Sequence, residues 1–419
     1  MYNLQQKSIA LISVHGDPAV EIGKEEAGGQ NVYVRKVGEA LAAGGWRVDM
    51  FTRASDSQQP KIVNHSPNCR TIRIHAGPED FIPRDEIFSY GEDFVAAFLK
   101  FQRREGIEYS LVHTNYWISG WVGLQLQEKL SLPMVHTYHS LGAVKYKSVS
   151  TIPMVARTRL RVEKACLEKA DRVVATSPQE KEHMHKLVSR FGKIAIIPCG
   201  TDIHLFGKVN RSEARERLGM EQDAKVVMYV GRFDKRKGIE TLVRAVNQSQ
   251  WRQDPRLKVI IGGGSRPGES DGWERERIEG IVAQQGMSER TYFPGRIEQE
   301  DLPLYYAAAD VCVVPSHYEP FGLVTIEAMA SRTPVVASHV GGLQFTVVDE
   351  ETGLLVPPQD VAAFAEAIDR ILNHRLWGVE LGINGRKRVE KKFSWYGVAS
   401  GLSQLYNKLI QEDDIAATA

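Results

Sequence analysis

The stretch KVVMYVGRFDKRKGIETLVRAV, residues 225–246, contains one complete unit of the expected fold. It begins with a short apolar run at 225–230, and from Ile239 its apolar side chains recur every three or four residues. A short apolar run predicts a buried strand, and the second pattern predicts an amphipathic helix. A loop rich in glycine and basic residues joins them, as is typical of a strand–loop–helix unit in a parallel sheet.

The same alternation extends in both directions from this stretch. In the first half, strands are expected at 9–14, 47–52, 71–75, 111–114, 134–138 and 172–176, with helices at 32–43, 90–105 and 156–170. In the second half, further strands are expected at 258–262, 291–293, 311–315, 334–337 and 353–356, with helices at 239–248, 274–285, 302–308, 323–330 and 361–372. This order predicts an α/β protein built from doubly wound parallel sheets, each with helices on both faces.

The length of 419 residues favours two domains over one, because a single core rarely grows that large. The stretch 202–223 carries Gly, Asn and scattered charge, which places the boundary there. The predicted domains are 1–205 and 206–393, followed by a helical pattern at about 394–412 and a polar, frayed tail at 411–419. Ligands of such sheets bind beyond the carboxyl ends of the strands, so two facing domains would form a binding cleft.

Composition excludes several classes of partner. The net charge of +1 provides no general attraction for nucleic acid or an acidic membrane. No apolar run approaches the roughly 20 residues that span a bilayer, and the first apolar run is too short for a signal peptide. The expectation is a cytoplasmic, soluble protein. The four cysteines, which form neither a disulfide framework nor a zinc motif, are Cys69, Cys166, Cys199 and Cys312.

The strongest motif is EPFGLVTIE, which begins at Glu319 and ends at Glu327. It follows an expected strand and opens an expected helix, so its two carboxylates flank a helix N-terminus. The free amides of Phe321, Gly322 and Leu323 can bind an anion there. Two carboxylates beside such amides suit a sugar phosphate. An ordinary acidic helix start is the alternative.

The loop after the strand at 225–230 provides a second candidate site. Arg232 and Lys237 could clamp a diphosphate, with Arg giving bidentate hydrogen bonds and Lys a point charge. A solvated basic turn is equally compatible with the sequence alone.

A glycine turn, Ala27-Gly28-Gly29-Gln30, precedes the helix expected at 32–43. Paired glycines let a backbone approach a phosphate closely, although a plain tight turn gives the same pattern. The glycine run at 262–264 lacks the spacing of a dinucleotide motif and predicts no nicotinamide site.

Several polar residues of the first half gain meaning only if the fold gathers them. The isolated cations are Arg84, Lys145, Arg157 and Arg159, each more often a surface charge. His139 follows an apolar strand at its carboxyl end, where a lone histidine is usually structural. The motifs of a serine hydrolase are absent from the sequence.

Taken together and in order, these motifs resemble family 4 of the retaining glycosyltransferases, whose GT-B fold pairs two Rossmann-like domains around a cleft. The resemblance covers nearly the whole chain. It implies that the last helix crosses back to the first domain. It also implies the donor site: Arg232 and Lys237 on the diphosphate, Glu327 on the ribose, Arg296 near the base, and Glu319 and His139 on the hexose. Gly29 and the amides of Phe321, Gly322 and Leu323 complete it. The catalytic residues that the resemblance implies are His139, Arg232, Lys237 and Glu319.

Two subgroups of that family come nearest. The sucrose-phosphate synthases of bacteria and cyanobacteria share the Gly28-Gly29-Gln30 turn and the stretch from His139 to Lys145. The inositol-phosphate N-acetylglucosaminyltransferases resemble 31–34 and 116–120, but typically have Met at Gln30 and Thr at Ser140. The first subgroup is favoured. It implies an acceptor-phosphate pocket formed by Gly29, Gln30, Arg84 (often Lys in relatives), Tyr116, Ser140, Lys145, Arg157 and Arg159.

The resemblance implies transfer of glucose from UDP-glucose or ADP-glucose to the 2-hydroxyl of fructose 6-phosphate, with retention and without a metal or other cofactor. Inositol phosphate or free fructose as acceptor, the latter as in sucrose synthase, remains an alternative. So does a non-catalytic sugar-nucleotide sensor, and, least of all, an unrelated structural Rossmann pair. The sequence does not determine which base the donor carries. It also leaves the oligomeric state open, and a monomer is one of the possible states.

Overall fold

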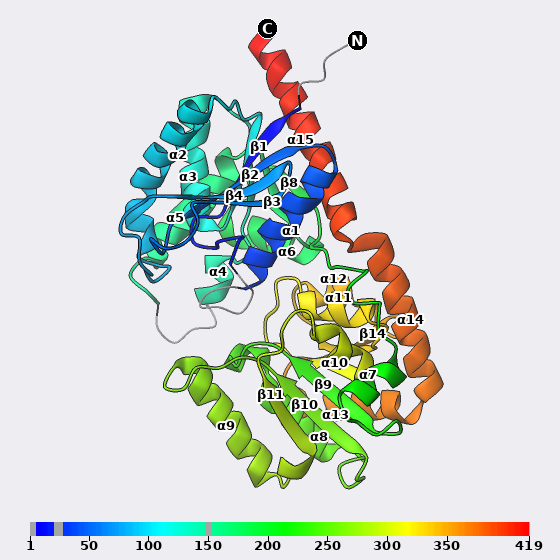
Figure 1. Ribbon diagram of the computed structural model, residues 1–419. Helices are drawn as coiled ribbons and strands as arrows, with labels where there is room; N and C mark the ends of the chain where they lie inside the picture. The colour runs from blue at the N-terminus through cyan, green and yellow to red at the C-terminus, as the bar shows by residue number, and fades with distance from the viewer. Residues whose placement is uncertain (1–5, 21–27, 147–151, 419) are drawn as a thin grey trace. The chain divides into compact units, whose positions relative to one another are not determined.

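The computed structural model describes residues 6–20, 28–146 and 152–418, except for the side chains of 414 and 416–418. It divides into two compact units (Figure 1). The first unit extends to Pro198 and resumes at Trp395, and the second runs from Cys199 to Ser394. The change of unit at Pro198 precedes the expected boundary at 205.

The first unit is built on a sheet whose described strands have the order β3-β4-β2-β1-β5-β6-β7-β8. All neighbours are parallel except the pair β3 and β4. The central strand β1 is buried along its whole length and pairs with β2 on one side and β5 on the other. The strands are β1 Ser8–Ile12, β2 Arg47–Arg53, β3 Ile62–Ser66, β4 Cys69–Ile74, β5 Leu111–Asn115, β6 Met134–Thr137, β7 Arg172–Ala175 and β8 Ile194–Ile196.

Helices cover both faces of this sheet. On one side α2, α3 and α5 pack together, and on the other α1 packs against the C-terminal helix α15 (Figure 1). The helices are α1 Gly29–Ala43, α2 Gly91–Glu105, α3 Trp117–Leu130, α4 Gly142–Lys145, α5 Ala156–Lys169, α6 Pro178–His183 and α15 Trp395–Thr418. This architecture confirms the predicted doubly wound layer.

Polar contacts fasten α15 to the first unit. Trp46 Nε1 donates to Ser403 Oγ at 2.9 Å, and the buried His113 ring meets the Tyr406 hydroxyl at 2.5 Å. The tail expected to fray from 411 continues as helix to Thr418. That expectation was wrong because a polar helix end resembles a loop in sequence.

The second unit contains a parallel sheet whose order, over its fully described residues, is β11-β10-β9-β12-β13-β14. Its strands are β9 Lys225–Val230, β10 Leu257–Gly262, β11 Thr291–Gly295, β12 Val311–Val314, β13 Val335–Ser338 and β14 Gly353–Val356. Its helices are α7 Arg211–Arg217, α8 Ile239–Gln248, α9 Ser270–Gln284, α10 Leu302–Ala308, α11 Leu323–Ala330, α12 Leu343–Thr346, α13 Val361–Asn373 and α14 Arg375–Lys392. The β9 and β14 bounds agree with the predicted strands.

The helices α3, α4, α6, α12 and α14 were not predicted, and neither were β3, β8 and α7. For the last three the physical reason is clear. Strand β3 is an antiparallel edge strand with little apolar character, and β8 is only three residues long. Helix α7 lies inside the stretch expected to be a linker. Helix α7 is short and depends on contacts that the sequence alone does not reveal. The Asn210 side chain caps it by accepting from the Glu213 amide at 3.0 Å, and the side chains of Arg211 and Arg215 anchor it to the rest of the unit.

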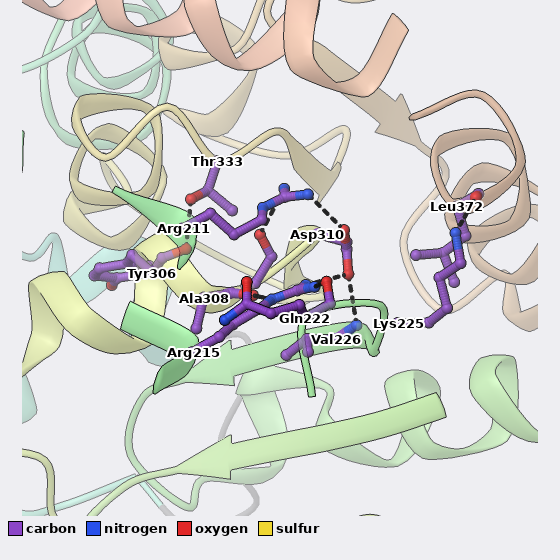
Figure 2. Close-up of polar contacts among 11 residues, drawn as sticks. Arg211, Arg215, Gln222, Lys225, Val226, Tyr306, Ala308, Asp310, Thr333 and Leu372 are labelled. Atoms are coloured by element: carbon purple, nitrogen blue, oxygen red, sulfur yellow. Dashed lines mark hydrogen bonds and ion pairs between the residues drawn. The ribbon is translucent and has the colours of Figure 1, made fainter. Parts of the chain in front are cut away.

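Those two arginines meet at Asp310, which precedes β12 (Figure 2). One Asp310 oxygen accepts from Arg211 at 2.8 Å, and the other accepts from Arg215 and from the Val226 amide, both at 2.8 Å. Arg215 also donates to the carbonyl of Ala308. A single carboxylate therefore joins α7, β9 and the end of α10.

We expect Asp310→Asn to lower the free energy of unfolding by about 2 kcal/mol, because removing one partner leaves buried guanidinium groups without compensation. The figure is below that of a fully buried pair because Asp310 is 13% exposed. Urea unfolding measures it. Asp360→Asn, which alters an exposed cap of α13, is the control, with a smaller expected loss. Equal losses in both variants would contradict a special role for Asp310.

None of the helices that the structure describes is long and apolar enough to cross a membrane. The four cysteines are all within the described ranges, and all are buried without a disulfide.

Candidate active site

The predicted site residues fall into two groups, one in each unit. In the second unit the carboxyl ends of β9 and β12 each lead into a loop. The first loop contains Arg232 and Lys237 and ends at Gly238, whose φ of +67° lies in the left-handed region. A Cβ on Gly238 would lie 2.0 Å from the carbonyl oxygen of Pro315. Glycine is therefore required for the two loops to touch.

The two loops are joined by an ion pair. Lys237 Nζ donates to Glu319 Oε2 at 2.5 Å, and the side chains are 25% and 14% exposed. Residues that lie 82 positions apart in sequence thus meet as the motifs implied. The neighbouring Arg236 is instead held by Asp234. Arg232 is exposed, and among the described residues no side chain forms a hydrogen bond or ion pair with its guanidinium.

The loop that carries Glu319 is fixed by glycines on the next loop of the sheet. The Gly342 amide donates to the Glu319 carbonyl at 3.0 Å, and a Cβ on Gly341 would lie 2.2 Å from that oxygen. Gly322, with φ of +91°, directly precedes α11. The helix N-terminus therefore lies beside the carboxylate, as predicted.

Phe321 and Leu323 contribute to this N-terminus through the backbone. The Phe321 ring is buried and packs edge-on against Phe393 at 5.8 Å, so it is not available to a ligand. Only the backbone amide of Phe321 can contact an anion bound at the N-terminus of α11.

Glu327 lies on α11, partly buried, and accepts from the buried Tyr306 hydroxyl at 2.9 Å. Burial raises the pKa of this carboxyl to about 7, against the opposing effect of the Tyr306 hydrogen bond. At neutral pH the group therefore titrates, which an ordinary surface glutamate does not.

Three glycines follow the ends of β9, β10 and β11 and form a side-chain-free edge. A Cβ on Gly263 would lie 2.1 Å from the Gly231 carbonyl, and the Gly263 amide donates to the Gly295 carbonyl at 2.8 Å. Arg296 comes directly after this edge and pairs with Glu298 at 2.8 Å. The strand ends therefore pack backbone against backbone here, which requires glycine at position 263.

In the first unit the centre of the predicted acceptor group is Arg159, which is 1% exposed. Its Nε donates to Glu163 at 2.7 Å, and its terminal nitrogens donate to the Tyr116 hydroxyl at 3.0 Å and the Ser140 carbonyl at 2.7 Å. Protein groups therefore use most of its donors. Arg159 organises Tyr116 and Ser140 more than it offers a free charge.

The guanidinium of Arg84 lies 5.7 Å from the centroid of the Tyr116 ring, and that of Arg159 lies 5.0 Å from the same centroid. Arg84 Nε is buried and makes no hydrogen bond with a described residue. Its nearest carboxylate, Asp85, is 3.9 Å away. Arg84 is therefore the less committed of the two cations.

His15 was not predicted and belongs to this group. Its ring lies 4.6 Å from the Tyr116 ring, and its Nδ1 is buried without a hydrogen bond to a described residue. Burial, followed by the charges of Arg84, His139 and Arg159, lowers its pKa to about 3. The arrangement is electropositive and suits an anion. In sequence the only signal was its position three residues after β1.

His139 has a φ of +59°, and its Nε2 lies 2.8 Å from Asn115 Oδ1. Burial lowers its pKa to about 3, so the ring is neutral at pH 7. Asn115, at the end of β5, was not predicted as a site residue. The structure makes His139 a neutral hydrogen-bonding group rather than a proton carrier.

The glycine turn opens α1, where Gly29 is exposed. Gln30 Nε2 donates to Ser13 Oγ at 3.0 Å, which holds the amide near the end of β1. Ala27, part of the same predicted turn, lies outside the described residues.

Lys145 and Arg157 differ in their relation to the cluster: Lys145 lies close enough to Glu163 for its charge to act on that carboxylate, whereas Arg157 does not face Arg159. Lys145 ends the short helix α4. Arg157 is exposed on α5, and two residues along a helix point to nearly opposite faces, so it does not accompany Arg159. The structure therefore does not bring Arg157 together with the other predicted acceptor residues.

Comparison with known proteins identifies the two halves. Residues 210–388 match the family model described as Glycosyl transferases group 1, and residues 28–200 match the Glycosyl transferase 4-like domain. The sequence is 36% identical over 409 residues to the D-inositol 3-phosphate glycosyltransferase of Corynebacterium efficiens, covering 96% of this chain and 95% of the relative. The corresponding protein of Corynebacterium glutamicum is also 36% identical, over 417 residues, covering 97% of this chain and 98% of the relative.

Solved structures show the same architecture. A sucrose-phosphate synthase from Thermosynechococcus elongatus is 54% identical, with a TM-score of 0.88, covering 97% of this chain and all of that chain. Anabaena HepE, solved with UDP and glucose, shares only the fold at 21% identity, with a TM-score of 0.76 over 96% of this chain and 100% of that chain. The chain belongs to the glycosyltransferases of this group 1 and 4-like family. The predicted GT-B fold is confirmed.

Proposed function

We propose that the protein transfers glucose from UDP-glucose or ADP-glucose to fructose 6-phosphate, with retention of configuration, giving sucrose 6-phosphate. The observation that carries this proposal is the 54% identity with a solved sucrose-phosphate synthase over nearly the whole chain. The cluster of Arg84, Tyr116 and Arg159 supports it, because it suits a phosphorylated acceptor.

On the donor side, Arg232 and Lys237 would bind the diphosphate, and Glu319 would bind the hexose beside the amides at the start of α11. Glu327 would accept from the ribose hydroxyls, with Arg296 near the base. As the bond to the diphosphate breaks, negative charge grows on the leaving oxygen, and a fixed cation stabilises it without reorganisation. No step in this scheme requires a metal ion.

On the acceptor side, Arg84, Lys145 and the backbone at Gly29 and Gln30 would hold the phosphorylated sugar, while Arg159 orients Tyr116 and Ser140. Since Nε2 of the neutral His139 ring donates to Asn115 Oδ1, Nδ1 would accept a hydrogen bond from a hydroxyl of the hexose. Since none of the sequence motifs offers a carboxylate for a covalent intermediate, the acceptor would attack on the same face that the leaving group departs from. The departing diphosphate would then take the acceptor proton.

A second candidate follows from the curated relatives, which are named D-inositol 3-phosphate glycosyltransferases and are 33–36% identical. Both candidates use a phosphorylated polyol, so the same basic cluster serves either one.

We expect the purified protein to use fructose 6-phosphate at least about 100-fold more efficiently than free fructose, because charge-assisted phosphate contacts are each worth about 1.5–3 kcal/mol. The measurement is kcat/KM for every pairing of UDP-glucose, ADP-glucose and UDP-N-acetylglucosamine with fructose 6-phosphate, fructose and inositol 1-phosphate. Preference for inositol 1-phosphate would establish the second candidate. Preference for free fructose would contradict the phosphate pocket, and nucleotide binding without turnover would indicate a sensor.

A further inference from the structure

Tyr306 lies on α10, and its side chain is fully buried. Two hydrogen bonds connect this residue to other parts of the second unit. The Tyr306 hydroxyl donates to Glu327 Oε2 at 2.9 Å, and its carbonyl accepts from Thr333 Oγ1 at 2.6 Å. Figure 2 shows the Thr333 contact at the helix. Tyr306 therefore joins α10 to the middle of α11 and to the turn that follows α11.

The end of α10 is anchored independently of Glu327. Arg215 donates to the Ala308 carbonyl at 3.0 Å and Arg211 to the Ala309 carbonyl at 3.1 Å, and both arginines pair with Asp310 (Figure 2). The Tyr306 ring also packs against Phe206, with centroids 5.8 Å apart. The hydroxyl is thus positioned by the fold of the second unit before any ligand binds.

Glu327 depends on this hydroxyl. Among the described residues, Tyr306 is its hydrogen-bond partner, and the other titratable group that faces it is the buried Cys312 thiol of β12. Burial raises the pKa of both Tyr306 and Cys312 well above neutral, so neither carries charge there. With Oε2 occupied, a bound diol must be received by the remaining capacity of the carboxylate.

We propose that Tyr306 is a positioning residue for nucleotide recognition: it fixes the Glu327 carboxylate in the orientation that receives the two ribose hydroxyls. This inference rests on the proposed function, in which Glu327 binds the ribose. Tyr306 does not touch the substrate and acts through Glu327.

The direct test is the affinity of Tyr306→Phe for UDP and for 2′-deoxy-UDP, measured by calorimetry, with ADP and 2′-deoxy-ADP in parallel. We expect wild-type protein to bind the preferred ribonucleotide about tenfold more tightly than its deoxy form, because a hydrogen bond to a charged group is lost. In Tyr306→Phe that ratio should fall to about threefold or less. An unchanged ratio would overturn the proposal.

The pH dependence gives a readout that a merely structural residue would not move. Glu327 must be ionised to accept both hydroxyls, so affinity should decline as pH falls through about 7. The Tyr306 hydroxyl stabilises the ionised form, and its removal should shift this decline to higher pH. A decline at the wild-type pH in Tyr306→Phe would contradict the assignment.

Two further variants separate the possible failures. Thr333→Val removes the other Tyr306 contact without touching Glu327, so it should lower the melting temperature but keep the ribose preference. Glu327→Gln should abolish both the preference and the pH dependence. If Glu327→Gln has no effect, the ribose role in the proposed function fails. If it has an effect and Tyr306→Phe has none, only the present inference fails.

Discussion

Lys237→Ala is expected to lower kcat for glucosyl transfer by about 100- to 1,000-fold, the effect of removing one preorganised group that stabilises transition-state charge. The side chain reaches Glu319 across two loops at 2.5 Å, so it is held at the donor side before substrate binds. A cation from the solvent could not replace the Lys237 ammonium, because ordering that cation during the reaction would cost free energy that the fixed side chain does not require. Steady-state kinetics with the preferred donor and acceptor measure the loss.

The matched control for this variant is Lys235→Ala in the same short turn, since Lys235 is exposed and outside the ion pair. It should keep turnover within about twofold, as surface changes usually do. Both variants should melt near the wild-type temperature, because the Lys237 pair is partly exposed and contributes little to stability. Turnover by Lys237→Ala within threefold of wild type would refute the diphosphate role.

Much of the donor half could be predicted because its chemistry follows the strand–loop–helix pattern. Gly238 and Glu319 occur in short motifs directly after strands, and parallel strands place their carboxyl ends at one edge. The contact between Lys237 and Glu319 also needs β9 and β12 to be neighbours in the sheet, and this strand order was not predicted from the sequence. What no local pattern revealed was the support from Tyr306 and Asp310, which are ordinary helix and loop residues in sequence and gain their roles by packing.

The acceptor half was harder to predict for the same reason. Arg157 and Arg159 looked equivalent as basic residues two positions apart, yet helix geometry exposes one and buries the other. Arg159 can be buried because Glu163 forms an ion pair with it in the core. His15 was passed over because a single histidine after a strand carries no pattern. Only the fold shows it against Tyr116.

Arg159→Met is expected to destabilise the first unit by about 3–5 kcal/mol, the cost of leaving one partner of a buried ion pair alone. Arg159 and Glu163 are 1% and 0% exposed, so solvent cannot compensate the remaining carboxylate. Tyr116 and Ser140 would also lose the donor that orients them. Urea unfolding at neutral pH measures the stability, and Arg161→Met, an exposed position on the same helix, should stay within about 0.5 kcal/mol.

The pH dependence of this deficit identifies its cause. Burial already raises the pKa of Glu163, and losing Arg159 removes the main opposing charge. A folded-state pKa above the unfolded value means that stability is lost as pH rises through that range, so the variant should recover part of its deficit in acid. Arg159→Met combined with Glu163→Gln should recover stability at neutral pH without recovering fructose 6-phosphate use. A deficit that is independent of pH would show instead that lost packing, and not the isolated Glu163 charge, destabilises the variant.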